Sequence, residues 1–149
     1  GAVILSESNK PGILSTTIGS DGSYKDLLTV DIDSEFIEMK GNDVFKIAVK
    51  TMGKLAVSTL QKNNMTIDEI NWLIPHQANS RIINAIAKKI SLPNEKVILT
   101  VDKHGNTSAA SIPLALDDAY QNGSLQEGDL IMFEAFGAGF TWGSALLKF

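Results

Sequence analysis

Hydrophobic and polar residues alternate along the chain with two different periods. Short apolar or alternating runs predict strands at residues 2–7, 13–18, 71–75, 97–101, 130–136 and 141–149. Broader apolar faces that recur every three to four residues predict helices over residues 43–62, 80–90 and 108–121. Residues 23–40 have no clear period, and we expect them to be largely irregular.

Turn and capping residues mark where several of these elements begin and end. Pro-Gly at positions 11–12 predicts a turn before the second strand, and Gly-Ala-Gly at 137–139 predicts a hairpin between the last two strands. We expect Asn42 to cap the first helix. Thr66 and Glu69 form a capping-box pair, which predicts a single helical turn.

This order of strands and helices predicts one α/β domain over residues 1–149. A chain of 149 residues with 44% hydrophobic content can bury a substantial core. The final hairpin makes the sheet mixed, because its two strands must run antiparallel.

Composition narrows the classes of function. The net charge of −4 argues against a nucleic-acid surface, and no charge-free run reaches the roughly 18 residues that a membrane-spanning helix needs. The chain has no cysteine, which removes disulfides, thiolate metal sites and a thiol nucleophile, and its two histidines have no metal-ligand spacing. We expect a reduced, cytoplasmic protein without a metal. The first residue is not Met, as expected of a fragment or a processed product.

Three segments carry residues suited to chemistry. His76 follows a buried strand, and Asn106 follows the predicted strand 97–101, where α/β sheets bind ligands. The third segment is the glycine-rich run 137–139, whose backbone N–H groups can hold an oxyanion. Each also has a plain structural interpretation: a satisfied loop histidine followed by Asn79 as a helix cap, a capped turn at Asn106, and an ordinary hairpin.

Parallel strands would bring the loops of His76 and Asn106 to one edge of the sheet. A neutral imidazole N–H and a carboxamide N–H could then converge on one carbonyl oxygen, an arrangement that suits an enolate. Ser108 and Ser111 have no evident base other than the same His76, so no residue pattern supplies a nucleophile.

The motifs together resemble the C-terminal half of β-ketoacyl-acyl-carrier-protein synthase III, a family of thiolase-like condensing enzymes. The resemblance rests on five stretches in family order: Ser-Asp-Gly at 20–22, Gly-Asn-Asp-Val-Phe-Lys at 41–46, Pro-His-Gln-Ala-Asn at 75–79 with Arg81, His-Gly-Asn-Thr-Ser-Ala-Ala-Ser at 104–111, and the run from Glu134 to Leu146 before the terminal Phe149.

The resemblance implies a layered αβα half with a five-stranded mixed sheet and a Cys-His-Asn active site between two halves. His76 matches the histidine and Asn106 the asparagine, while the cysteine belongs to an N-terminal half that this chain lacks. The family condenses acyl-CoA with malonyl-acyl-carrier-protein after loss of CO₂. The chain alone is therefore expected to be inactive.

Further roles follow from the same resemblance. The backbone N–H of Ala138 matches a donor to the acyl-cysteine carbonyl. The remaining matches line the pantetheine tunnel (Gly41, Asn42, Phe45 and Asn79) or dock the acidic carrier protein (Lys46, Arg81, Lys88 and Lys89). The implied substrates are CoA and phosphopantetheine thioesters without a separate cofactor. The implied partners are acyl carrier protein, acyl-CoA, the N-terminal half and a second copy in a homodimer.

Two other interpretations stay open at this point. The chain could be a non-catalytic module that binds CoA or carrier protein, since it has a basic stripe and no nucleophile. It could also belong to another thiolase-like synthase. A lone half of such an enzyme is expected to expose apolar surface.

Overall fold

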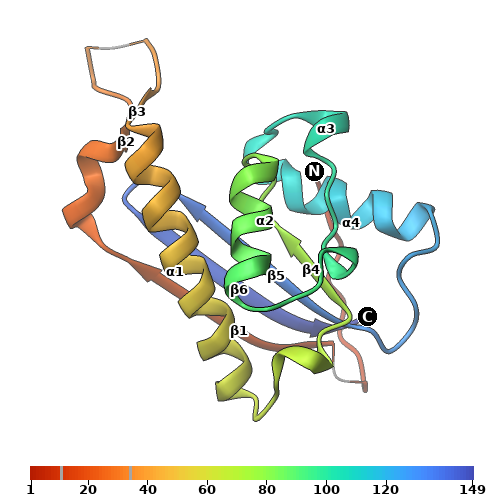
Figure 1. The fold of residues 1–149 in the computed structure, drawn as a ribbon. Coiled ribbons are helices and arrows are strands. Elements are labelled where there is room, and N and C mark those ends of the chain that lie inside the picture. The colour runs from red at the N-terminus through yellow and green to blue at the C-terminus, as the bar shows by residue number, and fades with distance from the viewer. Residues whose placement is uncertain (11, 34) are drawn as a thin grey trace.

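The computed structural model describes residues 1–10, 12–33 and 35–149 (Figure 1). Its main sheet has four strands in the order β1-β6-β5-β4. Their bounds are β1 (Ile13–Ser20), β4 (Trp72–Pro75), β5 (Leu130–Gly137) and β6 (Thr141–Lys148). Two short strands, β2 (Leu28–Thr29) and β3 (Glu38–Met39), pair with each other within the segment expected to be irregular.

Helices cover both faces of the main sheet, as the predicted αβα layering requires. The α-helices are α1 (Gly41–Lys62), α2 (Ser80–Lys89), α3 (Val101–His104) and α4 (Ser111–Gln121). Short 3-10 helices are η1 (Gly22–Leu27), η2 (Ile67–Glu69), η3 (Asn94–Lys96) and η4 (Ser108–Ala110). Helices α1 and α2 lie together on one face and α4 on the other (Figure 1).

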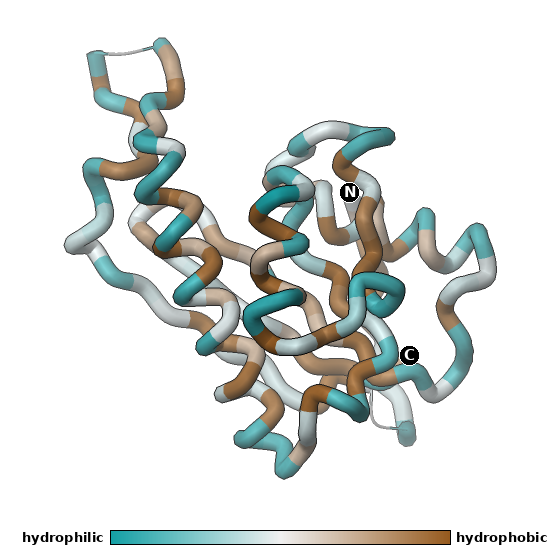
Figure 2. The backbone as a smooth tube through the Cα atoms, in the orientation of Figure 1, coloured by the Kyte–Doolittle hydropathy of each residue, from teal (hydrophilic) through white to brown (hydrophobic). Residues whose placement is uncertain are grey.

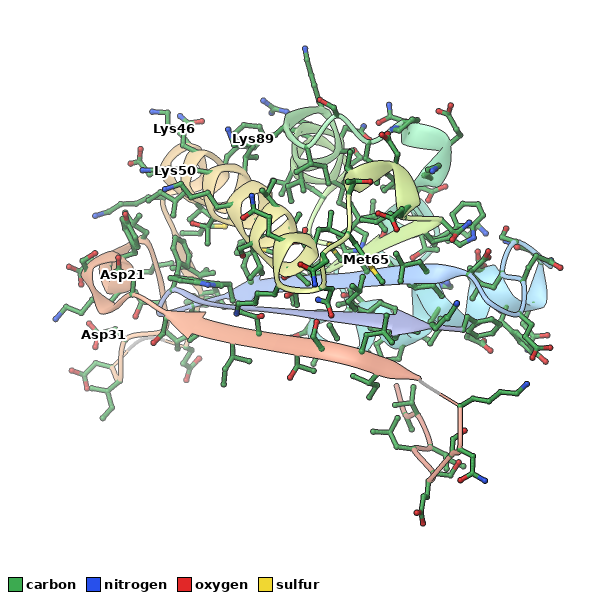
Figure 3. The ribbon with its side chains drawn as sticks, turned by 90° about the horizontal axis from the view of Figure 1, so that it is seen from below. Asp21, Asp31, Lys46, Lys50, Met65 and Lys89 are labelled. Atoms are coloured by element: carbon green, nitrogen blue, oxygen red, sulfur yellow. The ribbon has the colours of Figure 1, made fainter. Side chains whose placement is uncertain are left out.

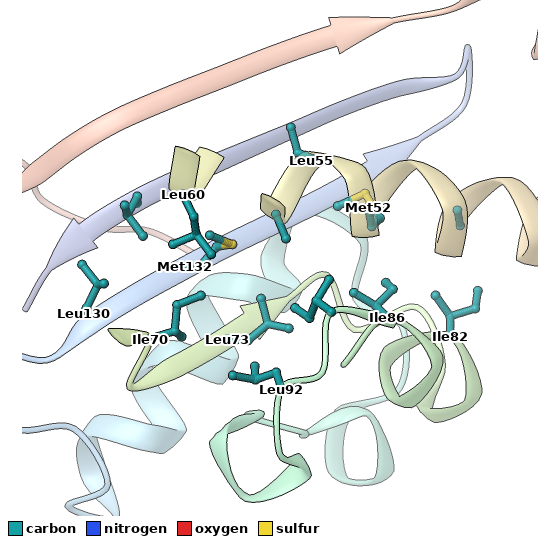
Figure 4. Close-up of a cluster of buried hydrophobic side chains, with 14 residues drawn as sticks. Met52, Leu55, Leu60, Ile70, Leu73, Ile82, Ile86, Leu92, Leu130 and Met132 are labelled. Atoms are coloured by element: carbon teal, nitrogen blue, oxygen red, sulfur yellow. The ribbon is translucent and has the colours of Figure 1, made fainter. Parts of the chain in front are cut away.

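Strand periodicity explains why two separate cores form. Leu73 of β4 and Met132 of β5 pack with α1 and α2. Their sequence neighbours Ile74 and Ile131 point to the opposite face and pack with α4, because successive side chains of a strand alternate between faces. The central strands are mostly hydrophobic along their length, whereas hydrophobic and hydrophilic residues alternate along the helices (Figure 2). Figure 4 shows the larger cluster, in which Met52, Leu73, Ile86 and Met132 interlock between helices and sheet.

Strand direction decides where the loops of the sheet meet. β4 runs parallel to β5, and β6 is antiparallel to both β5 and β1. The strands β1, β4 and β5 therefore share one direction, and their carboxyl ends at Ser20, Pro75 and Gly137 lie at the same edge. The predicted mixed sheet is confirmed, and so is the hairpin at 137–139.

The predicted fifth strand at 97–101 is wrong. Val97 makes a single parallel bridge to Leu73, and the Ile98 N–H donates to the Leu73 carbonyl at 3.0 Å. Beyond this point the Thr100 N–H donates to the side chain of Gln77 and not to a neighbouring strand, and Val101 begins the one-turn helix α3. The β-branched run thus lies beside β4 but forms no ladder, so the main sheet has four strands.

Two other predictions near the N-terminal end are corrected. Residues 2–7 form no strand, and Ile4 is 96% exposed, because no neighbouring strand of the described chain pairs with this run. Helix α1 begins at Gly41, so Asn42 lies inside it, and the preceding Lys40 makes no side-chain capping bond. Pro11, the first residue of the predicted Pro-Gly turn, lies outside the described residues.

Other local predictions are confirmed. The Thr66 N–H donates to the Glu69 carboxylate at 2.7 Å, as a capping box requires, and the Asn79 side chain accepts from the Ile82 N–H at 2.9 Å at the start of α2. Large apolar side chains are exposed in two stretches, as expected of a lone half: Val3, Ile4 and Leu5, then Val30, Ile32, Ile37 and Met39. Within the described residues, no helix is long and apolar enough to cross a bilayer.

Candidate functional site

A cleft of about 1340 Å³ opens at the shared edge where β1, β4 and β5 end. We call it the His76 cleft. Residues from several separated segments line it, among them Ser20, His76, Asn106, Ser111 and Ala138. The structure thus brings His76, Asn106 and Ala138 to one cavity. It does so even though the strand predicted to precede Asn106 does not form.

His76 is held from several sides. Its backbone N–H extends the pairing of β4 with β5 by donating to the Glu134 carbonyl at 2.7 Å. Its ring Nδ1 lies 2.7 Å from the Ser111 hydroxyl, and the ring meets Phe136 edge to face with centroids 6.1 Å apart. Partial burial lowers the pKa of His76 below its ordinary 6.5, since desolvation disfavours the imidazolium. The ring is therefore neutral at neutral pH.

Gln77, the next residue, ties the His76 loop to the segment that leads to Asn106. Its side chain is 1% exposed. The Nε2 group donates to the carbonyls of Pro75 at 2.8 Å and Ile98 at 3.2 Å, and Oε1 accepts from the Thr100 N–H at 2.8 Å. One buried amide thus bonds to three backbone polar groups. A lone glutamine carries no motif, so the role of Gln77 could not be predicted from the sequence.

Asn106 is oriented by its own turn. Its Oδ1 accepts from the Ser108 N–H at 3.0 Å, which leaves the Nδ2 group as the end that can donate to a ligand. The capped turn that the sequence predicted at Asn106 is therefore present. The preceding helix α3 is tied to α4 by an ion pair in which Lys103 Nζ lies 2.9 Å from Asp118 Oδ2. The loop carrying Asn106 is therefore supported at both ends.

The hairpin that carries Ala138 is attached to the end of β1. The Asp21 N–H donates to the Phe140 carbonyl and the Phe140 N–H donates back to the Asp21 carbonyl, both at 2.8 Å. The positive φ of this turn falls on Gly139, at 130°, and not on Ala138. Glycine is needed at 139, where a Cβ would lie 3.0 Å from the Thr141 nitrogen. Alanine at 138 therefore brings no backbone strain.

A second cleft of about 830 Å³ lies beside the first, between the starts of α1 and α2. We call it the Arg81 cleft. Its lining includes the residues expected in the pantetheine tunnel and two of those expected to dock the carrier protein: Gly41, Asn42, Phe45, Asn79, Lys46 and Arg81. The two clefts share Met39, Val44, Asn79 and Ile82. The two clefts therefore adjoin each other.

The basic residues occupy the outer side of α1 and α2. Arg81 lies over the Phe45 ring, with its guanidinium carbon 5.8 Å from the centroid. Figure 3 shows Lys46, Lys50 and Lys89 on the side of the helices that faces away from the sheet. Lys88 and Lys89 are exposed but line neither cleft, so the structure places them farther along α2 than Arg81.

Glu134 is a buried acid for which the sequence predicted no role of its own. It lies in β5 opposite Pro75 and Ser144 and is 1% exposed. Neither carboxylate oxygen has a hydrogen-bond partner among the described residues. Desolvation raises the pKa of Glu134 well above its ordinary 4.5. The side chain therefore stays protonated and neutral at pH values where an exposed glutamate is already ionised.

Comparison with known proteins agrees with this geometry. Residues 60–149 match the family model described as "3-Oxoacyl-[acyl-carrier-protein (ACP)] synthase III C terminal". The chain belongs to this family. The match includes the segments that carry His76, Asn106 and Ala138.

Relatives extend the similarity over the whole chain. Two curated synthase III proteins of the family, from Vibrio cholerae and Thioalkalivibrio sulfidiphilus, are each 54% identical and align with 100% of the chain. The chain spans about half the length of these relatives, 49% and 50%. The crystal structure of the synthase III from Aquifex aeolicus is 44% identical, with a TM-score of 0.92 over 97% of this chain and 46% of that one.

Gln77 gives a first prediction, about stability. Gln77→Glu keeps the size of the side chain but replaces the Nε2 donor with an oxygen that faces the Pro75 and Ile98 carbonyls. We expect the free energy of unfolding to fall by at least about 2 kcal/mol, because two buried acceptors lose their donor. Urea unfolding measures this loss, and the exposed Gln61→Glu on α1 is the matched control. Equal stability of the two variants would contradict the role of Gln77.

Glu134 gives a second prediction, about pH. Its folded-state pKa lies above its unfolded value, so the folded state holds the proton more tightly. The free energy of unfolding should then fall as pH rises from about 4.5 toward the folded pKa, by about 1.4 kcal/mol for each unit between the two pKa values. Glu134→Gln removes this fall, whereas exposed Glu127→Gln keeps it. Urea unfolding at pH 5 and pH 8 checks it, and an unchanged slope in Glu134→Gln would refute it.

Proposed function

We propose that residues 1–149 form the C-terminal thiolase-like half of a cytoplasmic β-ketoacyl-acyl-carrier-protein synthase III, the acyltransferase that initiates type II fatty acid synthesis. One observation carries the proposal. His76, Asn106 and Ala138 come from three separate segments, and all line the His76 cleft. Family membership and relatives at 54% identity support the same activity.

The proposed chemistry is a decarboxylative condensation. The bond between the carboxylate carbon and the α-carbon of a malonyl thioester breaks, CO₂ leaves, and the electron pair moves onto the thioester oxygen as an enolate. A neutral imidazole N–H of His76 and the Nδ2 group of Asn106 donate to that oxygen. Such donors stabilise the transition state more than the ground state, because the negative charge develops only during the reaction.

The electrophile of this reaction is an acyl thioester on a cysteine. The chain has no cysteine, so this group belongs to the N-terminal half of the same enzyme, which packs against this one. The enolate carbon attacks the acyl carbonyl and the cysteine thiolate leaves. The backbone N–H of Ala138 donates to the carbonyl oxygen during this attack. The acyl group, acetyl in the simplest case, comes from acyl-CoA, and no separate cofactor or metal takes part.

The two clefts support a route for the substrates. A phosphopantetheine arm enters through the Arg81 cleft, along Gly41, Asn42, Phe45 and Asn79, and its thioester reaches the His76 cleft. The acidic carrier protein docks on the basic residues above this entrance, Lys46, Arg81, Lys88 and Lys89. On a chain of net charge −4 these cations steer the partner locally. The complete enzyme is a homodimer in this proposal.

The donor pair is tested in the complete synthase, with this chain joined to its cysteine-bearing half. We expect His76→Ala and Asn106→Ala each to lower the rate of malonyl decarboxylation by roughly 10²–10³-fold, the usual loss for one oxyanion donor. Release of CO₂ from malonyl-acyl-carrier-protein measures this rate. The matched control is His104→Ala, an exposed histidine that does not line the His76 cleft.

Retained decarboxylation in both variants would overturn the donor pair. The chain without the other half should make no ketoacyl product from acetyl-CoA and malonyl-acyl-carrier-protein, and substantial turnover by it alone would also contradict the proposal. Binding of carrier protein without any activity of the joined halves would favour a non-catalytic module.

The docking face is tested by charge reversal. Arg81→Glu and Lys88→Glu should each weaken binding of the carrier protein on the order of tenfold and reduce its salt dependence, because each puts a negative charge against an acidic partner. Titration calorimetry measures the dissociation constant. Lys148→Glu makes the same charge change at the far end of β6 and should leave binding unchanged. Equal binding by Arg81→Glu, Lys88→Glu and Lys148→Glu would exclude this face.

A further inference from the structure

The Ser111 hydroxyl is the partner of the His76 imidazole. Ser111 begins helix α4, on the face of the sheet opposite α1 and α2, and is 2% exposed. Its oxygen lies 2.7 Å from His76 Nδ1 and accepts from the Gln77 N–H at 3.2 Å. These are the two partners of the hydroxyl within the described residues.

Donor and acceptor accounting assigns the proton on this contact. A backbone N–H can only donate, so the bond from Gln77 occupies one lone pair of the Ser111 oxygen. The hydroxyl hydrogen is buried and needs an acceptor, and His76 Nδ1 is the acceptor within reach. The opposite arrangement, with a proton on Nδ1, would leave the buried hydroxyl hydrogen unpaired, which is unfavourable.

We propose that Ser111 is a positioning residue that holds His76 in the neutral tautomer with its proton on Nε2. Nδ1 accepts from Ser111, so in a neutral ring the hydrogen belongs to the other nitrogen. Phe136 meets the same ring edge to face and restrains its rotation. The link to catalysis rests on the proposed function, in which His76 must donate a hydrogen to the enolate oxygen.

The arrangement also explains the position of Ser111 in the cleft. Its hydroxyl is directed to Nδ1 and to the loop behind the imidazole, so it is a second partner of the histidine and not a nucleophile. Gln77 contributes through its backbone to this bond and through its side chain to the Asn106 segment. Both proposed donors therefore depend on the same short loop.

The tautomer is tested on the chain itself, without substrate. The chain is labelled with ¹⁵N in its histidine rings, and long-range proton–nitrogen spectra are recorded at pH 8, above the ordinary His pKa of 6.5. The chain has two histidines, so a His104→Asn background leaves His76 alone in the spectrum. We expect one tautomer, with Nδ1 at the shift of an unprotonated nitrogen and Nε2 at that of a protonated one.

Three variants separate the proposed role from general stability. Ser111→Ala should shift both nitrogen resonances toward the values of a tautomer mixture. Ser111→Thr keeps a hydroxyl and should retain the wild-type shifts. Ser144→Ala removes another buried hydroxyl, which lies 2.7 Å from Thr59 Oγ1, and should leave His76 unchanged.

Protonated Nδ1 in the His104→Asn chain would overturn the proposal, and this result needs no substitution at Ser111. Wild-type shifts in Ser111→Ala would overturn it too. The outcome is independent of the decarboxylation assay. If the tautomer is as proposed but His76→Ala keeps full activity, the proposed function fails and the role of Ser111 stands.

Discussion

The buried amide of Gln77 is the interaction on which the site depends. One end of this amide donates to the Pro75 and Ile98 carbonyls, and the other accepts from the Thr100 N–H. These bonds give buried backbone groups a partner where the chain leaves the side of β4 at Ile98 and turns toward Asn106. A buried side chain with all its polar atoms paired specifies one arrangement of the two loops.

Strand direction supplies the rest of the geometry. Because β6 alone runs against the others, the ends of β1, β4 and β5 meet, and three loops that are far apart in the sequence share one cavity. The helices add a second feature. Asn79 caps α2 through its side-chain oxygen and lines both clefts, so this helix begins where the two clefts adjoin.

Much of this was predictable from the sequence, and the errors have physical causes. The apolar periods located α1, α2, α4 and the last two strands, since burial on one face leaves a regular pattern. Residues 97–101 have the composition of a strand, but whether they pair depends on Gln77, 20 or more positions earlier, which local propensity does not reveal. Residues 2–7 are apolar yet exposed, because a strand also needs a neighbour.

Some residues of the site could likewise be predicted from the sequence, and others could not. His76, Asn106 and Ala138 were accessible through motif order, and the structure places them in one cleft. Ser111 and Gln77 were not, because their importance lies in hydrogen bonds between distant segments. Glu134 is hidden for a third reason: one acid in an apolar strand looks like an exposed position until its neighbours are known.

The reciprocal bonds between Asp21 and Phe140 have a consequence for how such proteins diverge. They join the hairpin tip to the start of η1. The position of the tip, and with it the Ala138 amide, therefore depends in part on residues more than a hundred positions earlier in the chain. Asp21 also anchors η1 by accepting from the Ser23 N–H. Because both bonds are made by main-chain groups, side chains at the turn and at the tip can change without breaking them, and proline, which has no N–H, is the one residue that would remove a bond at Asp21 or Phe140.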